Sequence, residues 1–405
     1  MTDLLFLVQR IPYPPTKGEK IRHLQFLRHL CENYSVHLGC LVDDPEDVQH
    51  IETVKRLCIS SHFARIDRAR AKFSCLSGLL TGEPLSVVFY RDRGLANWVR
   101  HVMEDIKPDI IVVCSSNMAP YIFDVRKTGT PCLVDLVDVD SEKWRAYAQT
   151  GAFPMNLVYR REWRRVAELE ARIARECDAS LFVSDEEAAL FQELQPQFRA
   201  KIHAVGNGVD LEYFDPALGF DAPYTLDRAN FVFTGTMDYP PNIDAVVWFA
   251  RDILPIIRRS LPQARFHIVG SGPAPQVRAL ASIPGVFVTG RVADVRSYVA
   301  HATASVAPMR IARGIQNKVL EAMAMGRPTV VTSDALEGIK AVPGTDLLLA
   351  DSAEDFARAC LTAAEPGAAA LGQSARQRVL RDYTWAEQLR KFDAFLNERK
   401  NAPVL

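Results

Sequence analysis

Short runs of apolar and β-branched residues alternate along the chain with longer amphipathic stretches, and these runs fall into two series. The first series predicts strands at Leu4–Val8, Ser35–Val42, Asp109–Cys114, Cys132–Leu136 and Ala179–Ser184. The second predicts strands at Asn230–Gly235, Arg265–Gly270, Val286–Gly290, Ala304–Pro308 and Pro328–Thr332. Apolar strands without polar alternation, separated by helices, are typical of parallel sheets covered on both faces. The pattern therefore predicts an α/β protein with two doubly wound domains in tandem.

A turn-rich segment separates the two series. The residues VGNGVDLEYFDP, Val205–Pro216, contain an Asn-Gly turn and end in a proline, which is typical of a connection between domains. We therefore predict an N-terminal Rossmann-like domain over residues 1–205 and a C-terminal one over residues 206–385. Residues 386–405 are predicted to form an amphipathic helix that docks back on the body. The apolar stripe of this last helix consists of Trp385, Leu389, Phe392 and Leu396.

The composition narrows the class of protein without changing this picture. The 405 residues are 48% hydrophobic and 24% charged, with a formal net charge of −1, so no global positive field favours nucleic acid. Eight cysteines occur without a CxxC pair or a histidine cluster, which indicates reduced thiols and no metal site. No apolar run reaches the ~18 residues of a membrane span, and the N-terminus lacks a signal-peptide pattern. These observations favour a cytoplasmic protein, or one that touches a membrane without crossing it.

Ligands of doubly wound sheets bind at the carboxyl ends of the strands, so we expect the site in a central cleft that both domains face. After the first strand, RIPYPPTKGEKIRHL places Gly18 just before a helix and Arg22 within it. A glycine there fits a close approach to a phosphate or a simple tight turn. The glycine patterns of dinucleotide-binding and P-loop proteins are missing from the sequence.

Hydroxyl and acidic residues follow two later strands of the first half. Ser115 follows DIIVVC, and Asp138 and Asp140 lie in VDLVDVDSEKW. Magnesium sites usually take one or two carboxylates with substrate phosphates, so this spacing by itself does not indicate a metal. Helix capping by Asp140 or Ser141 is an equally good explanation. We predict an acceptor side formed by Arg22, Ser115, Asp138 and Asp140, with Asp138 contacting a substrate hydroxyl.

The loops after the strands of the second half are rich in glycine, which leaves backbone N–H groups accessible. The loop after the first of these strands fits either a scaffold or a ligand contact, and Asn242 is predicted to cap the next helix. The turn after Val286–Gly290 can offer backbone hydrogen bonds and a narrow slot to a flat base. The candidate donor-side residues of these loops are Gly235, Thr236, Gly270, Gly290, Arg291 and Val292.

The stretch GIQNKVLEAMAMGRPTVV, Gly314–Val331, predicts a loop, a short helix and a buried strand. Asn317 is the predicted N-cap, and Gly326 with Pro328 ends the helix. Lys318 lies in the first turn, where the positive end of the helix dipole disfavours a cation unless an anion binds there. The buried stripe is predicted to contain Val319, Leu320 and Met323, and the opposite face Lys318, Glu321 and Met325.

Positive groups gather in front of this helix. Arg310 and Arg313 precede it and Gly314 frees the loop backbone, so the charges and the helix dipole favour an anion, most simply a diphosphate. Glu321, one turn further on, can accept hydrogen bonds from two vicinal hydroxyls, such as those of a ribose. The alternative is an exposed Lys318–Glu321 pair, which would contribute only ~0.3 kcal/mol. We favour a nucleotide site formed by Arg310, Arg313, Gly314, Asn317, Lys318 and Glu321.

A long helix is predicted over Asn156–Cys177, with arginines clustered around Trp163. A solvated face is the usual explanation of such a charged helix. The alternative is a patch at Arg160–Arg165 that contacts anionic lipid head groups, with Trp163 at the interface.

Several motifs together resemble the glycosyltransferase family 4 group. They are VGNGVDLEYFDP, HIVGSGP, FVTGRVADVRSYVAHA, APMRIARGIQNKVLEAMAMGRPTVV and the closing YTW. The stretches PYPPTKGEKIRHL, DVDSEKW and GTMDYPPNIDAVVWF more narrowly resemble the sugar transferases associated with exosortase (PEP-CTERM) and exopolysaccharide gene clusters. The resemblance covers nearly the whole chain.

The resemblance implies a GT-B fold, with a UDP- or GDP-linked sugar donor on the C-terminal domain and an acceptor on the N-terminal one. Family members are typically metal-independent and retain the anomeric configuration, so no cofactor is implied. Glu321 resembles the second glutamate of the family's E-x7-E motif, which holds the ribose. Gly18 resembles the glycine that approaches the diphosphate, Gly290 the base-binding turn, and Gly314 the loop residue that faces the sugar or phosphate.

Three positions depart from the family pattern. The first glutamate of E-x7-E falls at Arg313, and the Arg and Lys that usually follow the first strand of the second domain are missing from GTMDYPPNIDA. The usual histidine after the fifth strand is replaced by VDVD. Lys318, Arg313 or Arg310 is expected to supply the missing positive charge. The expected catalytic residues are Asp138, Lys318 and Glu321.

The expected function is transfer of a sugar from a nucleoside diphosphate to a hydroxyl of a growing, lipid-linked glycan in exopolysaccharide biosynthesis. Two alternatives stay open, a non-catalytic nucleotide-sugar-binding subunit and a GT-B nucleotide-sugar epimerase. A nicotinamide-dependent oxidoreductase is disfavoured because its glycine fingerprint is missing. The expected location is the cytoplasm or the inner face of the plasma membrane.

Overall fold

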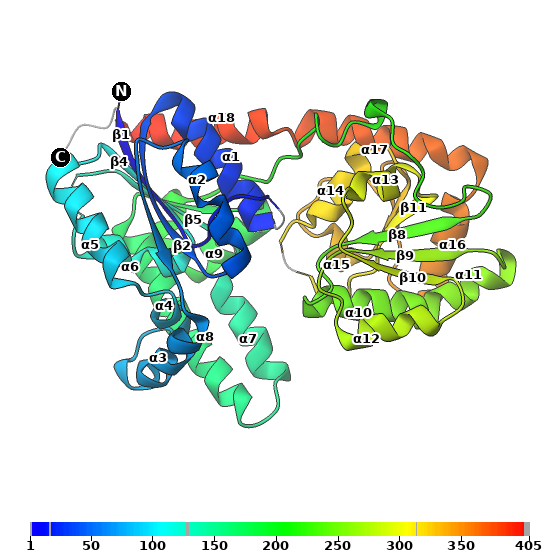
Figure 1. The fold of residues 1–405 in the computed structure, drawn as a ribbon, viewed down its shortest axis with the longest axis horizontal. Coiled ribbons are helices and arrows are strands. Elements are labelled where there is room, and N and C mark those ends of the chain that lie inside the picture. The colour runs from blue at the N-terminus through cyan, green and yellow to red at the C-terminus, as the bar shows by residue number, and fades with distance from the viewer. Residues whose placement is uncertain (1, 16–17, 127–128, 313, 401–405) are drawn as a thin grey trace. The chain divides into compact units, whose positions relative to one another are not determined.

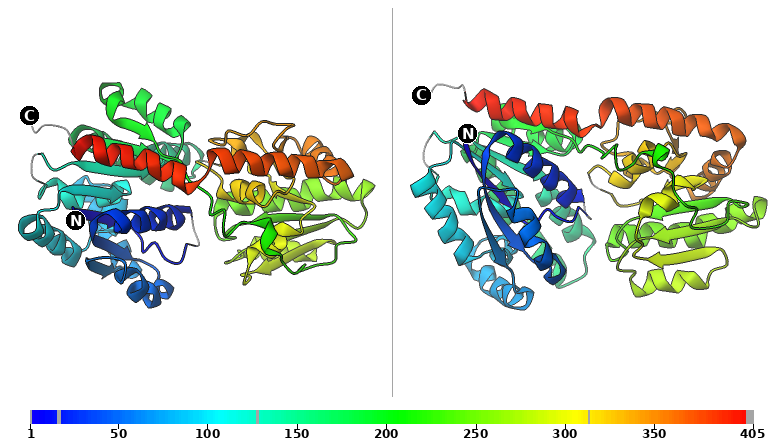
Figure 2. Two further views of the ribbon diagram at one scale, coloured as in Figure 1. Left: turned by 90° about the horizontal axis from the view of Figure 1, so that it is seen from above. Right: turned by 45° about the horizontal axis from the view of Figure 1, so that its top comes forward.

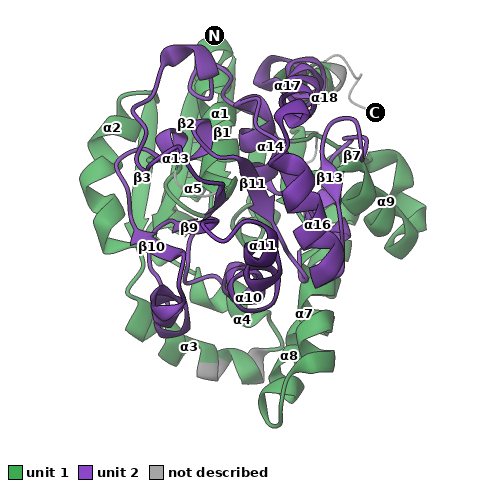
Figure 3. Ribbon diagram, turned by 90° about the vertical axis from the view of Figure 1, so that its right-hand side faces the viewer, with its two compact units in different colours: residues 1–206, 388–405 green, residues 207–387 purple. Residues whose placement is uncertain are grey.

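The computed structural model describes residues 2–15, 18–126, 129–312 and 314–400. The chain divides into two compact units (Figure 3). Unit 1 consists of residues 1–206 and 388–405, and unit 2 consists of residues 207–387. Each unit is built on a parallel sheet with helices on both faces (Figure 1).

Unit 1 contains a seven-stranded sheet in the order β3-β2-β1-β4-β5-β6-β7, in which all neighbouring strands are parallel. The order reverses between β1 and β4, so this is a doubly wound sheet with a switch point next to its first strand. The strands are β1 (Asp3–Val8), β2 (Ser35–Val42), β3 (Ser60–Arg65), β4 (Ile110–Cys114), β5 (Cys132–Val137), β6 (Ala179–Phe182) and β7 (Ile202–Ala204).

The helices of unit 1 cover both faces of this sheet. On one face, Leu5 and Leu7 of β1 pack in one cluster with Leu95 of α5 and Ile173 of α8. The opposite face of the sheet carries α1. The helices are α1 (Gly18–Asn33), α2 (Ile51–Lys55), α3 (Arg68–Thr81), α4 (Leu85–Phe89), α5 (Arg93–His101), α6 (Pro120–Phe123), α7 (Asp140–Thr150), α8 (Met155–Glu176) and α9 (Asp185–Leu194).

The last helix, α18 (Trp385–Lys400), lies beside α1 in both views of Figure 2. Phe392 stacks on Phe26 of α1 with ring centroids 4.4 Å apart, and His29 forms a 2.7 Å hydrogen bond with Asp393. The Gln388 side-chain carbonyl accepts a 2.9 Å hydrogen bond from the backbone N–H of Gly206. These contacts join the end of the chain to unit 1, with Phe392 fully buried.

Unit 2 contains a six-stranded parallel sheet in the order β10-β9-β8-β11-β12-β13. Its strands are β8 (Asn230–Thr234), β9 (Arg265–Val269), β10 (Val286–Gly290), β11 (Ala304–Ala307), β12 (Thr329–Val331) and β13 (Leu348–Leu349). Its helices are α10 (Pro240–Trp248), α11 (Leu254–Ser260), α12 (Pro275–Ala279), α13 (Val295–Ala300), α14 (Asn317–Ala324), α15 (Ser333–Leu336), α16 (Ala353–Ala363) and α17 (Ala369–Asp382). Phe231, Phe249 and Phe266 are fully buried in its core.

Three strands of the structure are not predicted by the apolar pattern: β3, β7 and β13. All three lie at an edge of a sheet. The sequence of β3 is SSHFAR, with Ala64 its one buried residue, and β7 and β13 have only three and two residues. Edge strands need fewer apolar residues because neighbours cover less of their surface, so the pattern that reveals central strands does not reveal them.

Candidate functional site

Three glycines of unit 2 end neighbouring strands at the carboxyl edge of its sheet. The Gly235 N–H donates to the Val269 carbonyl (3.1 Å), and the Gly270 N–H donates to the Gly290 carbonyl (3.2 Å). A Cβ atom on Gly270 would lie 1.7 Å from the Gly235 carbonyl oxygen, and the Gly270 φ is +152°. Only glycine fits there, because the two backbones touch. The structure thus brings these three predicted donor-side residues together.

Lys318 reaches this edge from α14 and is held there by two contacts. Its ammonium group donates a 2.7 Å hydrogen bond to the Asn242 side-chain carbonyl and lies 4.6 Å from the centre of the Phe233 ring. The Asn242 amide in turn donates to the Thr236 carbonyl at 2.9 Å. This chain of contacts places a cation beside the loop that follows β8.

Asn242 does not cap α10, which is a correction to the sequence prediction. The N-cap residue of α10 is Tyr239, and Asn242 lies inside the first turn with only 5% of its surface exposed. Its side chain links the Thr236 loop to Lys318 instead. A proline-led helix start followed by an asparagine is visible in the sequence, but the partner of the asparagine side chain lies 76 residues away.

The start of α14 also differs from the sequence prediction. Gln316 is the N-cap residue and makes no side-chain capping bond, and Asn317 is the first helical residue. The Asn317 side-chain oxygen accepts a 3.2 Å hydrogen bond from Asn207 instead. The first backbone N–H groups of α14 therefore do not donate hydrogen bonds to a capping side chain.

Met325 is 1% exposed, although the helical projection placed it on the polar face with Lys318 and Glu321. The reason is that Met325 packs in the core cluster of unit 2, so neighbouring elements cover this end of the helix. The predicted buried residues Val319, Leu320 and Met323 are all buried. Gly326, with φ +65°, supports the predicted end of the helix.

Lys318 and Glu321 are both partly buried, and burial shifts both pKa values toward neutrality. Burial lowers the pKa of Lys318 to about 8, an effect that the Glu321 charge partly opposes. Burial raises the pKa of Glu321 to about 7, and the Lys318 charge partly opposes that shift as well. Among the described residues none donates a hydrogen bond to the Glu321 carboxylate. Its oxygens are therefore available to hydroxyl groups of a ligand.

The other predicted cations of unit 2 are placed differently. The Arg310 guanidinium forms an ion pair with both Asp244 carboxylate oxygens and lies 5.2 Å from the Trp248 ring, so its charge is compensated. Arg313 lies outside the described residues. Arg291 is exposed, and Val292 packs against a small apolar cluster of Val232, Val269 and Ala302. Gly314 is buried, with φ +66°.

At the carboxyl edge of unit 1, Arg22 is fully buried. It donates to both carboxylate oxygens of Asp135, at 2.7 and 2.8 Å, and to the Gly206 carbonyl at 3.0 Å. Both members of the pair have no exposed surface. The Arg22 guanidinium is therefore not exposed, as contact with an acceptor would require. It joins α1, β5 and residue 206 within unit 1. Gly18 begins α1 and is exposed.

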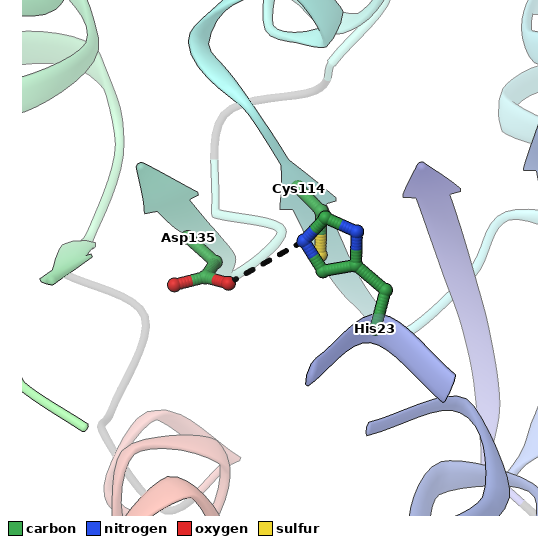
Figure 4. A group of neighbouring side chains, drawn as sticks. All are labelled: His23, Cys114 and Asp135. Carbon is green, nitrogen blue, oxygen red and sulfur yellow. Dashed lines mark ion pairs between the residues drawn. The ribbon is translucent and has the colours of Figure 1, made fainter. Parts of the chain in front are cut away.

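Beside this pair, His23, Cys114 and Asp135 point toward one another (Figure 4), and their potential ligand atoms all lie within 4.8 Å of one another. His23 Nε2 is 3.8 Å from Asp135. The group does not fit a metal ion well, because Arg22 occupies both Asp135 oxygens. Burial also holds the pKa of the Cys114 thiol well above its usual range, so the thiolate that a metal needs is disfavoured.

The loop after β5 is bent sharply and held by two buried glutamates that the sequence interpretation did not select. Val137 has φ +69°, a left-handed conformation that a β-branched residue rarely adopts. The Glu187 carboxylate accepts from the Val139 N–H at 2.7 Å, and the Glu170 carboxylate accepts from the Ser141 N–H at 3.1 Å. Strained backbone that is fixed by its surroundings is common at functional sites.

Neither Asp140 nor Ser141 is the N-cap of α7, because that position belongs to Val139 and no side chain caps it. Glu170 and Glu187 bind the N–H groups of this loop instead. Ser115, after β4, also has a left-handed backbone, with φ +81°. The predicted acceptor-side residues Ser115, Asp138 and Asp140 thus follow the adjacent strands β4 and β5.

Asp138 is the most unusual of these side chains. Burial raises its pKa to about 7, and the negative charges of Glu187 and Asp140 act in the same direction. One carboxylate oxygen, Oδ1, is buried and has no hydrogen-bond partner among the described residues. A carboxyl group in this state can accept a proton or a hydrogen bond from a substrate hydroxyl near neutral pH.

We expect Asp138→Asn to leave stability unchanged near pH 4 and to raise the melting temperature by several degrees near pH 9. The native pKa is about 7 and the ordinary value is 3.8, so the folded protein holds this proton more tightly. Stability therefore falls as the pH rises between these two values, and an amide removes that loss. Thermal unfolding of both proteins across this pH range tests the prediction. Parallel melting curves at every pH would contradict it.

Comparisons with known proteins find a matching family and similar folds. Residues 228–365 match the family described as "Glycosyl transferases group 1". Sucrose-phosphate synthase from Thermosynechococcus elongatus superposes with a TM-score of 0.70 and 17% identity, over 98% of this chain and 99% of that one. No curated protein sequence matches the chain.

Two further solved structures are similar and contain ligands. Anabaena HepE in complex with UDP-glucose has a TM-score of 0.67 and 15% identity, covering 98% of this chain and 100% of that one. A variant of S. aureus TarM, in complex with fondaparinux, alpha-GlcNAc-glycerol and UDP, has a TM-score of 0.65 and 12% identity, covering 99% and 100%. At these identities the likeness shows the fold. The predicted GT-B fold is confirmed, and the whole segment that matches the glycosyl transferases of group 1 lies in unit 2.

Proposed function

We propose that this protein is a glycosyltransferase that uses a nucleotide sugar as donor. The observation that carries the proposal is the arrangement of Lys318 and Glu321, which lie half-buried on α14, with Lys318 linked through Asn242 to the loop after β8. The match of residues 228–365 to the glycosyl transferases of group 1 supports it. So do the similar GT-B structures that contain UDP or UDP-glucose.

In the proposed donor site, the diphosphate binds beside Lys318 and the uncapped start of α14. A cation, free N–H groups and the helix dipole all stabilise the same negative charge there. Glu321 accepts hydrogen bonds from the two ribose hydroxyls, one turn along the helix. The base lies at the turn of Gly290, Arg291 and Val292. The compensated Arg310 contributes less than Lys318 does.

Catalysis in this proposal depends on stabilising the leaving group. As the bond between the sugar C1 and the phosphate oxygen breaks, negative charge grows on the diphosphate, and Lys318 stabilises it. The acceptor hydroxyl attacks C1 on the same face, which retains the configuration, and the departing phosphate takes its proton. Asp138 is the residue of unit 1 that we propose for contact with a hydroxyl of the acceptor. No metal ion and no cofactor take part.

We further propose that the donor is UDP- or GDP-linked and that the acceptor is a glycan on a polyprenyl lipid in exopolysaccharide biosynthesis. The protein would act in the cytoplasm, at the inner face of the plasma membrane. The resemblance to sugar transferases of exosortase-associated clusters supports this part. A peripheral contact with anionic lipid near Arg160–Arg165 would bring the protein to such an acceptor.

The test is a thermal-shift panel of nucleotides and nucleotide sugars, followed by an assay for release of the nucleoside diphosphate. We expect one nucleotide class to raise the melting temperature by mass action. Its sugar conjugate should be consumed only when an acceptor is present. Turnover without an acceptor would indicate an epimerase, and binding without any turnover would indicate a non-catalytic subunit. If no nucleotide shifts the melting temperature, the proposed donor site is wrong.

A further inference from the structure

Large apolar side chains are exposed on α3 and at the tip of the helical hairpin formed by α7 and α8. Phe153, between the two hairpin helices, is 80% exposed, and Phe73 on α3 is 74% exposed. Leu157, in the first turns of α8, is 56% exposed. Both elements extend from the sheet of unit 1 on the same side (Figure 1). Exposed residues of this size, gathered on one part of a protein, usually mark an interaction surface.

Direct contacts join the end of α3 to α8, so the two elements are neighbours in unit 1. Arg161 of α8 donates to the carbonyl oxygens of Gly78 (2.6 Å) and Glu83 (3.0 Å), at the end of α3. Leu157 lies one turn before Arg161 on the same face of α8. It therefore points toward the end of α3, where Leu79 is 44% exposed. We call Phe73, Leu79, Phe153, Met155 and Leu157 the apolar tip surface.

The arginines near this surface have unequal roles. Arg161 is bound to Glu162 and to backbone carbonyls, and Arg165 is paired with Glu168. Arg160 and Arg164 are exposed and make no ion pair within the part of the chain that the structure describes. Contacts within the protein therefore account for Arg161 and Arg165, whereas Arg160 and Arg164 are exposed and available to bind an anion.

On α3 the charge is also positive. Its sequence, RARAKFSCLSGLLT, contains Arg68, Arg70 and Lys72 and no acidic residue. Arg68 and Arg70 are paired with Asp43 and Asp67, whereas Lys72 is exposed without an ion pair to a described residue. The chain as a whole has a formal net charge of −1, so the excess of positive charge is local.

Aromatic side chains lie behind the hairpin tip. Trp144, Tyr147 and Tyr159 form a group with ring centroids 5.8 to 5.9 Å apart, and Tyr147 is 36% exposed. Apolar tips, flanking cations and amphipathic aromatic rings are the features of a protein surface that sits at a lipid–water interface. Among the described residues, no helix has the length and apolar character that would let it cross the bilayer.

We infer that the apolar tip surface inserts into the interface of an anionic lipid bilayer, with Arg160, Arg164 and Lys72 bound to lipid phosphates. Both elements begin at the carboxyl edge of unit 1: α3 starts at Arg68, which pairs with Asp43 after β2, and α7 starts two residues after Asp138. The elements that carry the surface thus start at the same edge of the unit 1 sheet as the proposed acceptor side. The inference deepens the lipid contact of the proposed function and in that part rests on it, whereas the donor site on unit 2 is independent of it.

Flotation of the protein with lipid vesicles tests the inference. We expect binding to mixed phosphatidylglycerol and phosphatidylcholine vesicles, and much weaker binding to pure phosphatidylcholine. Each basic residue near an anionic surface contributes about fivefold to binding, so Arg160→Gln with Arg164→Gln should weaken it about 25-fold. Phe73→Ser with Phe153→Ser should weaken binding to a similar degree, because it removes the inserted apolar area.

Matched controls lie on unit 2. Arg251 and Arg259 are exposed, and replacing both by glutamine removes the same charge without touching the surface. Leu226, 58% exposed, provides the apolar control as Leu226→Ser. Nucleotide binding by thermal shift should be unchanged in every variant, which separates this inference from the donor site and shows that the variants fold.

Absence of binding to anionic vesicles would overturn the inference. It would also be overturned if the unit 2 controls weakened binding as much as the tip variants. A change in sedimentation of the tip variants without any vesicle binding would assign the surface to a protein partner or a second copy of the chain instead.

Discussion

Replacing Glu321 by alanine is expected to weaken binding of the donor nucleotide by at least about 100-fold. The carboxylate is partly buried on α14, and no described residue donates a hydrogen bond to it, so its two oxygens can each accept from one ribose hydroxyl. A hydrogen bond to a charged group contributes about 1.5–3 kcal/mol, and the alanine variant loses two of them. Isothermal titration of the parent and the variant with the nucleotide identified by thermal shift measures the loss.

Two controls sharpen this experiment. Glu321→Gln keeps an acceptor oxygen in place and should lose less affinity than Glu321→Ala. A 2′-deoxynucleotide removes one hydroxyl from the ligand, so the effects of the deoxynucleotide and of Glu321→Ala should not add fully. Equal affinity of the parent and Glu321→Ala would show that this carboxylate does not hold the ligand.

Replacing Lys318 by alanine is expected to lower the turnover number about 100-fold, with a smaller effect on donor affinity. The ammonium group is fixed by Asn242 and Phe233 beside the loop after β8, so its position does not need to be organised during the reaction. Its interaction with the diphosphate strengthens as the leaving group gains charge. Steady-state kinetics with a saturating acceptor separates the turnover number from the Michaelis constant.

Arg310→Gln is the matched control for Lys318→Ala, because it removes a cation from the loop that leads into α14. Arg310 is already compensated by Asp244, so its loss should lower turnover much less. A larger loss with Arg310→Gln than with Lys318→Ala would mean that the loop rearranges on binding and that Arg310, not Lys318, meets the diphosphate.

The pH dependence of donor binding is expected to reflect the ionisation of both Lys318 and Glu321. Glu321 is anionic above a pKa of about 7 and Lys318 is cationic below a pKa of about 8, so binding should be strongest between these values. A nucleotide sugar is the right probe, because its diphosphate diester keeps its charge over this range. Glu321→Ala should remove the acid limb of the profile and Lys318→Ala the alkaline limb.

The central strands of both sheets were predictable because they carry continuous apolar sequence. Residues of β1, β4 and β8 are buried on both faces, so Leu4–Val8 and similar runs stand out from their surroundings. The edge strand β3 was not predictable, because its partly exposed residues include serine and histidine. Helix ends were only partly predictable: Gly326 indicated the end of α14, but Asn317 did not cap its start.

In the candidate site, too, the residues recognisable from their local sequence were predictable, and those that act through remote partners were not. Glycine at strand ends, and a lysine and a glutamate three residues apart on a short helix, could be selected from the sequence. The actual role of Asn242, and the glutamates Glu170 and Glu187, could not, because each acts through a partner between 29 and 76 residues away in the chain. Arg22 carries a charge that looked available in the sequence, and only its pairing with Asp135 showed that it is buried.

The sequence by itself determined the class of fold, the two α/β halves and the loops that follow the strands, because these depend on the local periodicity of apolar residues and on glycine. Only the tertiary structure decided which charges remain uncompensated. Burial moves the pKa values of Lys318, Glu321 and Asp138 toward neutrality, whereas ion pairs neutralise Arg310 and Arg22. The physical reason is that a charge depends on its solvent exposure and on the distance to its partners, and both are set by residues remote in sequence.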